Sequence, residues 1–242
     1  MKSILITGGS RGIGKATAVL AARRRWSVAI TCVRDKAAAD DTAERVRQHG
    51  AKSIVIQGDV GIEADVTRMF SSTVESFGRL DGVVINAGIV APATNLSEMT
   101  LERLEAMFRT NILGSYLSAR EAVRHMEAGG SIVNVSSLAS KTGSPGEYLD
   151  YAGSKGAMDT LTVGLAKEVG SRGIRVNAVR PAFIDTDIHA SSGNRQRAHF
   201  LGAQTPLGRA GTAEEVAEAI VWLLSDASSY VSGALIDMAG GR

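Results

Sequence analysis

Residues 4–14 read ILITGGSRGIG, an apolar run that leads into a glycine-rich turn. The β-branched start predicts a buried strand over Ile4 to Thr7, and the residues after the turn predict a helix over 12–24. The glycines leave room for a pyrophosphate to approach the backbone amides of the turn and of the helix N-terminus. Tight turns also need glycine for structural reasons alone, but the order of strand, turn and helix favours a dinucleotide site.

The same alternation of strand and helix continues along the chain. Strands are predicted at residues 4–7, 28–33, 54–57, 83–86, 132–136, 174–179 and 235–238. Helices are predicted at residues 12–24, 36–49, 62–77, 101–127, 151–170 and 213–224. Strands that are apolar on both faces and alternate with helices predict an α/β fold, a doubly wound Rossmann-like domain whose parallel sheet has helices on both faces.

Composition is typical of a globular protein. Of the 242 residues, 44% are hydrophobic and 21% are charged, and no repeat or linker divides them, so we expect one domain over residues 1–242. The net charge of +2 argues against a nucleic-acid partner. The four histidines lack the spacing of metal ligands, and we predict no metal site.

The N-terminus and the cysteine content both bear on the compartment. The apolar run that follows Met1-Lys2-Ser3 is too short for a signal peptide or a membrane span. Cys32 is the single cysteine, so no internal disulfide is possible, and this suits a reducing interior. We therefore expect a cytoplasmic protein with no membrane partner.

Tyr151 and Lys155 are spaced so as to share one face of a helix. A free tyrosine has a pKa near ~10, and a cation at about 4 Å supplies ~4 kcal/mol, enough to lower that pKa by roughly 3 units. We therefore expect Lys155 to lower the pKa of Tyr151 and to make it a proton donor and acceptor near neutral pH. By itself the spacing is weak, because many solvated helices carry it by chance.

Further motifs accompany this pair in a fixed order. The turn has the spacing Gly-x-x-x-Gly-x-Gly, and it is followed by Asn86-Ala87-Gly88, Asn111, Ser137 and Tyr151-x-x-x-Lys155. With these motifs the chain resembles the short-chain dehydrogenase/reductase family over essentially its whole length. The resemblance implies a seven-stranded parallel sheet and a reversible hydride transfer between NAD(P) and a small-molecule carbonyl or alcohol substrate.

The resemblance also implies roles for individual residues. Tyr151 would be the general acid of the reduction and the base of the oxidation, and Lys155 would lower its pKa and bind the nicotinamide ribose. Ser137 would orient and polarise the substrate carbonyl, and Asn111 would hold a water that links Lys155 to solvent. The residues expected to bind the cofactor are Gly8, Ser10, Arg11, Gly12, Ile13, Gly14, Arg34, Asp59, Val60, Asn86, Ala87, Gly88, Tyr151, Lys155, Pro181, Ile184 and Thr186.

Two positions depart from the pattern of the family. Ile85 stands where an asparagine is common, which alters little because the Ala-Gly turn remains. Ala182 follows Pro181 where a glycine is usual. If this position requires a positive φ, alanine strains the loop that meets the nicotinamide by roughly 1 kcal/mol.

The end of the second strand bears on the choice between NADP(H) and NAD(H). An acidic residue there would bind both ribose hydroxyls and repel a 2′-phosphate, but the predicted position falls at Cys32 or Val33. Arg11 and Arg34 are suitable partners for a phosphate dianion. NADP(H) is therefore the preferred cofactor, with NAD(H) possible because a shift of one or two residues would bring Asp35 to the selecting position.

The segment from about 183 to 211 interrupts the alternation and is predicted to be a substrate loop or lid. Its composition identifies no substrate. The leading hypothesis is an NADPH-dependent carbonyl reductase. The alternatives are a 3-oxoacyl-carrier-protein reductase, which would need basic residues such as Arg195, Arg197 and Arg209 near the cleft, and a non-catalytic dinucleotide-binding regulator.

A homotetramer is expected by analogy with the family, largely through the helices that begin near residues 101 and 151. The second of these helices carries small residues that would permit close packing of helices. They are Ala152, Gly153, Gly156, Ala157 and Gly164. The same residues could instead pack against the sheet of one subunit.

Overall fold

The computed structural model describes residues 2–186 and 197–242. Its centre is a seven-stranded sheet in the order β3-β2-β1-β4-β5-β6-β9, and every neighbouring pair of strands is parallel. The strands are β1 Ser3–Ile6, β2 Ser27–Cys32, β3 Ser53–Gln57, β4 Gly82–Ile85, β5 Ser131–Val135, β6 Arg175–Pro181 and β9 Leu235–Met238. The predicted parallel sheet is confirmed.

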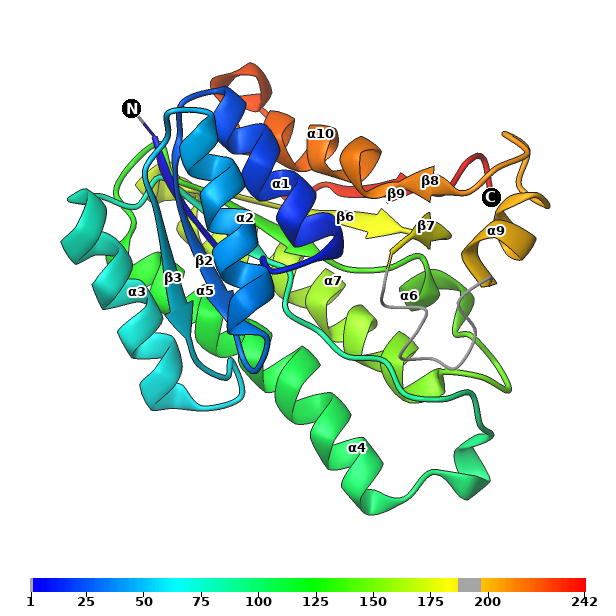
Figure 1. The fold of residues 1–242 in the computed structure, drawn as a ribbon. Coiled ribbons are helices and arrows are strands. Elements are labelled where there is room, and N and C mark those ends of the chain that lie inside the picture. Colours follow the sequence, from blue (N-terminus) through cyan, green and yellow to red (C-terminus); the bar gives the residue numbers. More distant parts are fainter. Residues whose placement is uncertain (1, 187–196) are drawn as a thin grey trace.

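Helices cover both faces of the sheet (Figure 1). One face carries α1 Gly12–Arg23, α2 Lys36–Gln48 and α10 Ala213–Leu224; the other carries α3 Glu63–Phe77, α5 Gly114–His125 and α7 Leu149–Val169. The shorter helices are α4 Leu101–Phe108, α6 Ala139–Thr142 and α9 Arg197–Gly202. Within the described part of the chain, no helix combines the length and apolar character that a membrane crossing requires.

β1 shows how the sheet is buried on both faces. Ile4 and Ile6 belong to the core on the side of α1, α2 and α10, whereas Leu5 belongs to the core on the side of α3, α5 and α7. All three side chains are fully buried. Because successive side chains of a strand point to opposite faces, a strand between two helix layers is apolar throughout.

The strand order reverses at β1. β2 lies on one side of β1 and β4 on the other, so the segments that leave β1 and β4 diverge and form a crevice at the carboxyl ends of the strands. The Thr7 hydroxyl accepts hydrogen bonds from the backbone amides of Asn86 and Ala87 at 2.9 and 3.0 Å. The glycine-rich turn after β1 and the turn after β4 are therefore joined at this crevice.

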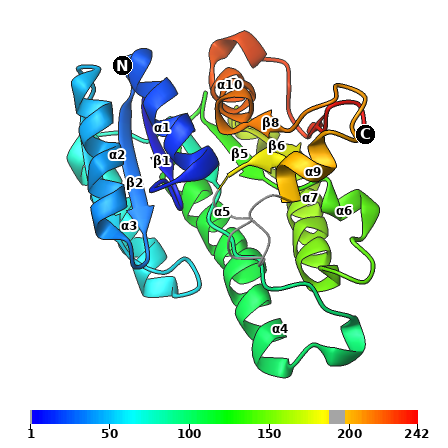
Figure 2. The same cartoon turned by 45° about the vertical axis from the view of Figure 1, so that its right-hand side comes forward.

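The helix predicted over 101–127 is not continuous. A π-helical segment, Arg109–Leu113, separates α4 from α5, which follow one another end to end (Figure 2). Within it, the buried Asn111 accepts a hydrogen bond from the Ile89 amide at 2.8 Å and donates one to the Ile89 carbonyl at 3.0 Å. The period of the apolar residues does not predict this interruption, because the π-helical segment accompanies the polar contact between Asn111 and the loop at Ile89.

The segment 183–211 contains regular structure that the sequence did not predict. β7, Ile184–Asp185, pairs in parallel with β8, Gly211–Thr212, and α9 lies between them in the chain. Part of the predicted substrate loop, residues 187–196, lies outside the described residues.

Candidate active site

A cleft of about 1090 Å³ lies at the carboxyl ends of the strands, between the segments that follow β1, β2, β3, β4, β5 and β6. Most residues that the sequence assigned to cofactor binding or catalysis line it. These are Gly8, Ser10, Arg11, Gly12, Ile13, Arg34, Asp59, Val60, Asn86, Ala87, Gly88, Ser137, Tyr151, Lys155, Pro181, Ile184 and Thr186. Gly14 and Asn111 are buried and do not line the cleft.

The glycine-rich turn has a backbone that only glycine adopts readily. Gly8 and Gly12 have φ values of +66° and +53°, in the left-handed region. A Cβ atom at Gly14 would lie 2.5 Å from the Gly8 carbonyl oxygen. Arg11, the N-cap of α1, provides no side-chain cap, so the first amides of this helix lie at the cleft without a side-chain acceptor. This arrangement fits a phosphate group.

Asn86 holds the glycine-rich turn from the other side of the crevice. Its Nδ2 donates to the carbonyls of Thr7 and Gly8 at 3.0 and 2.8 Å. Two residues further on, a Cβ atom at Gly88 would lie 3.3 Å from Asn111 Oδ1 and 3.5 Å from Lys155 Nζ. The turn after β4 thus connects the glycine-rich turn to the surroundings of Lys155.

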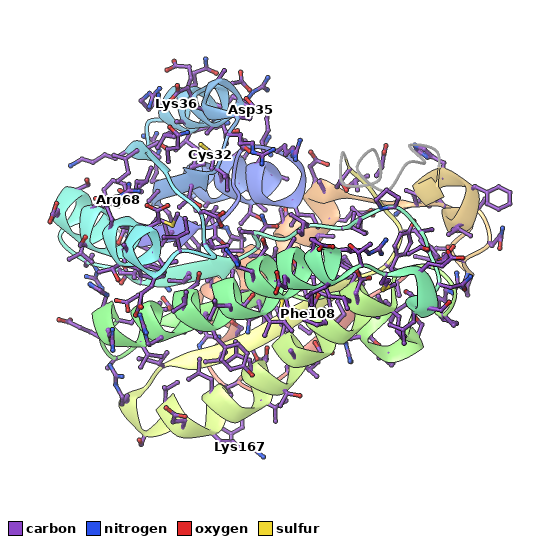
Figure 3. The ribbon with its side chains drawn as sticks, turned by 90° about the horizontal axis from the view of Figure 1, so that it is seen from below. Cys32, Asp35, Lys36, Arg68, Phe108 and Lys167 are labelled. Atoms are coloured by element: carbon purple, nitrogen blue, oxygen red, sulfur yellow. The ribbon has the colours of Figure 1, made fainter. Side chains whose placement is uncertain are left out.

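β2 ends at Cys32, one residue before the predicted strand end and at one of the two positions, Cys32 or Val33, expected for the selecting residue. Figure 3 shows Cys32 with Asp35 and Lys36 beyond it at the start of α2. Asp35 is the N-cap of α2, and its Oδ1 accepts a hydrogen bond from the Ala38 amide at 3.0 Å. Burial, and secondarily the charge of Asp40, raises the pKa of the Cys32 thiol, so this end of the strand carries no thiolate at neutral pH.

Asp59 and Val60, which were expected to bind the cofactor, line the cleft after β3. Asp59 Oδ1 accepts a hydrogen bond from the Gly61 amide at 2.8 Å, which closes a short turn. The Asp59 amide donates to Asp65 Oδ2 at 2.9 Å. These bonds fix the backbone of Asp59 while Val60, 3% exposed, provides an apolar wall.

Ser137 and Tyr151 bring two hydroxyl groups together in the cleft. Ser137 follows β5, whereas Tyr151 lies in the first turn of α7, and their side chains form a hydrogen bond. Ser137 Oγ also accepts a hydrogen bond from the Ala139 amide at 3.2 Å. A carbonyl oxygen that entered this part of the cleft could meet both hydroxyls.

The predicted direction of the Tyr151 pKa shift is wrong. Burial raises the pKa of Tyr151, and the hydrogen bond with Ser137 opposes this only in part. Lys155 Nζ donates to the Val135 carbonyl at 2.8 Å and lies over the Tyr151 ring, 5.6 Å from its centre. The ammonium is therefore bound to a strand end instead of the phenolic oxygen, and Tyr151 is a neutral phenol at pH 7.

Lys155 is itself strongly affected by its surroundings. It is 3% exposed, and burial lowers its pKa to about 8, although the charge of Asp159 acts in the opposite direction. Asp159 lies one turn further along α7, where its Oδ2 is 3.4 Å from Arg180 Nη1. Lys155 is thus a mostly protonated cation at pH 7 whose charge is lost within the mildly alkaline range.

Asn111 is connected to the helix that carries Tyr151 and Lys155. Its Nδ2 donates to Ser154 Oγ at 3.1 Å, and Ser154 Oγ donates to the Tyr151 carbonyl at 2.7 Å. Asn111 therefore supports the first turns of α7 from behind the cleft wall. The water expected beside Asn111 stays a prediction.

The loop after β6 is not strained at Ala182. Among the described residues other than glycine, only Arg25 and Ser144 have a positive φ, so the strain that the sequence raised for Ala182 does not arise. Further on, Thr186 side-chain atoms would lie 3.6 Å from a Cβ atom at Gly12. The segment that follows β6 therefore reaches the glycine-rich turn.

Several residues that line the cleft were not predicted from the sequence. They are Ile89, Val90, Ala106, Thr110, Leu138, Ala139, Thr142, Ser144, Pro145, Glu147, Tyr148, Phe183, Leu201 and Arg242. They come from six separate stretches of the chain and form no local motif, so only the fold brings them together. Ser144, with φ of +45°, is the unusual one, because a side chain beyond Cα disfavours this region.

Comparison with known proteins agrees with this geometry. The family model described as "Enoyl-(Acyl carrier protein) reductase" matches residues 8–242. The chain is 48% identical to "Uncharacterized oxidoreductase YgfF" of Escherichia coli, with all of both chains covered. It is 37% identical to "Versicolorin reductase stcU" of Emericella nidulans, covering 99% of this chain and 95% of that one.

A solved structure shares the fold closely. It is a short-chain dehydrogenase from Burkholderia cenocepacia in complex with NADP, with a TM-score of 0.92 and 32% identity over 99% of this chain and 97% of that one. The match extends over the whole sheet and both helix layers. Sequence, fold and the residues of the cleft agree, and the chain belongs to the short-chain dehydrogenase/reductase family of NAD(P)-dependent oxidoreductases.

Proposed function

We propose that the protein is an NADPH-dependent carbonyl reductase with Tyr151 as its general acid. The observation that carries the proposal is the hydrogen-bonded pair of Ser137 and Tyr151, in the same cleft as the glycine-rich turn and beside the buried Lys155. Two hydroxyls and one cation at a dinucleotide cleft suit the reduction of a C=O group.

Each side chain has a distinct part in this reaction. When bound, the nicotinamide supplies the hydride that reduces the carbonyl carbon. Tyr151, kept neutral by its raised pKa, gives its phenolic proton to the carbonyl oxygen, while Ser137 donates a hydrogen bond to the same oxygen. The Lys155 ammonium stabilises the phenolate that remains on Tyr151. In the oxidation the same proton returns to Tyr151.

The preference for NADP(H) rests on charge at the end of β2. Arg11 and Arg34 line the cleft, and neither side chain forms an ion pair with another described residue. The carboxylate of Asp35 caps α2, which supports reading it as a structural group instead of a ribose ligand. The relative from Burkholderia cenocepacia was solved with NADP, which adds support by analogy.

Kinetics with purified protein test both parts of the proposal. Oxidation of NADPH is followed over a panel of carbonyl compounds, and Tyr151→Phe is expected to lower kcat by about 10²- to 10⁴-fold, because the acid is lost. Full turnover by this variant would contradict the proposal.

The cofactor preference is read in the same assay. Arg11→Ala and Arg34→Ala are each expected to lower kcat/KM for NADPH by about 10- to 100-fold and to leave that for NADH nearly unchanged. Lys15→Ala is the control, since Lys15 is paired with Asp41 and does not line the cleft. Equal use of NADH by the unmodified protein would refute the preference.

Neither alternative function gains comparable support. For a carrier-protein reductase, Arg209 would have to receive an acidic partner, but Arg209 is already paired with both carboxylate oxygens of Glu215 at 2.9 and 2.6 Å. Arg195 lies outside the described residues. For a non-catalytic regulator, the pairing of Ser137 with Tyr151 would have no purpose.

The remaining parts of the proposal concern the domain organisation, the substrate loop, the oligomeric state and the location of the protein. We propose one domain over residues 1–242, a lid role for the segment 183–211, a homotetramer and a cytoplasmic location. Phe183 and Leu201, one from each described part of that segment, line the cleft and support the lid role. The buried thiol Cys32 is compatible with a reducing compartment.

A further inference from the structure

Arg103 and Asp150 form a buried two-point ion pair between α4 and α7. Arg103 Nε lies 2.8 Å from Asp150 Oδ2, and Arg103 Nη2 lies 3.2 Å from Asp150 Oδ1. The Asp150 side chain is fully buried, and that of Arg103 is 15% exposed. Asp150 immediately precedes Tyr151 in the first turn of α7.

The remaining hydrogen bonds of the pair reach the active site from two sides. Asp150 Oδ1 also accepts a hydrogen bond from the Tyr151 amide at 2.9 Å. Arg103 Nη1 donates to the Pro92 carbonyl at 2.6 Å. Pro92 belongs to the segment after β4, which lines the cleft through Ile89 and Val90. The pair therefore joins α4, the start of α7 and one wall of the cleft.

The start of α7 needs such a contact. Amides in the first turn of a helix have no partner within the helix, and the N-cap residue Tyr148 supplies no side-chain cap. Asp150 gives the Tyr151 amide an acceptor. Burial acts to raise the pKa of Asp150, but the hydrogen bonds from Arg103 and from the Tyr151 amide outweigh it and lower that pKa, so the carboxylate remains charged at neutral pH.

We infer that Arg103 and Asp150 are positioning residues of the reductase, a clamp that fixes the backbone of Tyr151 relative to the cleft wall at residues 89–92. The inference rests on the proposed function. Neither residue touches the reacting atoms. The clamp sets the position from which the phenol of Tyr151 meets a substrate oxygen, and small displacements of a catalytic group are costly to rate.

The test compares Asp150→Asn and Arg103→Met with Glu121→Gln. Glu121 is a matched control, because its side chain is 2% exposed and pairs with Arg120 and Arg124 on α5, away from the cleft. All proteins are assayed at a temperature at which circular dichroism shows them folded. Both clamp variants are expected to lose about 10- to 100-fold in kcat, whereas the Kd for NADPH, measured by fluorescence, changes by less than about two-fold.

Two further variants make the test specific. Arg103→Lys keeps the cation but not the two-point contact, so a smaller loss of about 3- to 10-fold is expected, and it carries the test if Asp150→Asn fails to fold. The double variant Arg103→Met/Asp150→Asn is expected to lose no more activity than either single variant, because each single substitution already breaks the same ion pair.

The outcomes separate the clamp from the proposed function. If the folded clamp variants keep the kcat of Glu121→Gln, the ion pair is only structural and the inference is overturned. Tyr151→Phe is measured alongside. Its full activity would refute the proposed function itself, whereas an inactive Tyr151→Phe with active clamp variants would refute the clamp alone.

Discussion

Lys155 is a buried cation, 3% exposed, and its burial has a measurable effect on the free energy of unfolding. Burial lowers its pKa from an ordinary value of 10.5 to about 8. Between these two values the unfolded chain binds a proton at this lysine and the folded protein does not. Stability rises with pH wherever the unfolded state binds more protons, so the penalty for burying this group is relieved as the pH increases.

We therefore predict a pH-dependent difference between the protein and its Lys155→Met variant. From pH 8 to pH 10, the free energy of unfolding of the unmodified protein is expected to rise by about 2 kcal/mol relative to the variant. Urea unfolding followed by tryptophan fluorescence at several pH values measures it. The range stops at pH 10 because tyrosines of the unfolded chain titrate near ~10 and would add to the pH dependence above it. A difference that is constant with pH would show that Lys155 is not desolvated.

At the scale of single residues, the sequence predicted which side chains meet in the cleft better than it predicted their pKa values. Ser137, Tyr151 and Lys155 lie together as expected, because their spacing along one helix and after one strand determines where they fall. The predicted direction of the Tyr151 pKa shift was wrong, because burial raises this pKa and the Lys155 ammonium that was expected to lower it is bound to the Val135 carbonyl instead. The Val135 carbonyl belongs to β5, whereas Lys155 lies on α7, and a backbone carbonyl leaves no pattern in the sequence that would predict this contact.

The π-helical segment between α4 and α5 is a feature at the scale of the element. An apolar period of three and four residues continues through residues 101–126, so the sequence predicts one helix. The interruption follows from the amide of Asn111, which bonds both backbone groups of Ile89. The helices could be predicted where the period of apolar residues alone determines them, but not where the contact of a single buried amide interrupts them.

The ion pair between α4 and α7 could not be predicted either. Asp150 is next to Tyr151 in the sequence, but its partner Arg103 lies 47 residues away, so no local pattern joins the two.

We predict that Asn111→Ala is strongly destabilising. The substitution removes the side chain of the fully buried Asn111 and leaves the amide and carbonyl of Ile89 without their partner in a part-buried site, at a cost of about 2 kcal/mol or more. Ser118→Ala is the control on α5, since the buried Ser118 hydroxyl donates to the Gly114 carbonyl of its own helix, and its loss should cost about 1 kcal/mol or less. Denaturant unfolding of both variants gives the comparison. Equal stability of the two would mean that Asn111 does not hold the π segment.

At the scale of the whole molecule, exposed apolar side chains recur along α4, the π segment, α5 and the start of α7. Leu101, Phe108, Leu113 and Tyr116 are 66%, 40%, 47% and 44% exposed along α4, the π segment and α5. Leu149, at the start of α7, is 41% exposed. Figure 3, seen from below, labels Phe108 on this side of the molecule, where α5 and α7 lie. Exposed apolar side chains on neighbouring elements are a common feature of subunit interfaces.

We therefore predict that the protein associates through this surface and that a charge placed within it separates the subunits. Phe108→Glu buries an unpaired carboxylate if the interface forms, which costs several kcal/mol and shifts the mass toward smaller species. Sedimentation velocity at micromolar concentration measures the mass of the unmodified protein and of the variant. Phe200→Glu is the control, because Phe200 is 70% exposed on α9, outside this surface. A tetramer that persists in Phe108→Glu would assign association to another face, and a monomeric unmodified protein would refute the oligomer altogether.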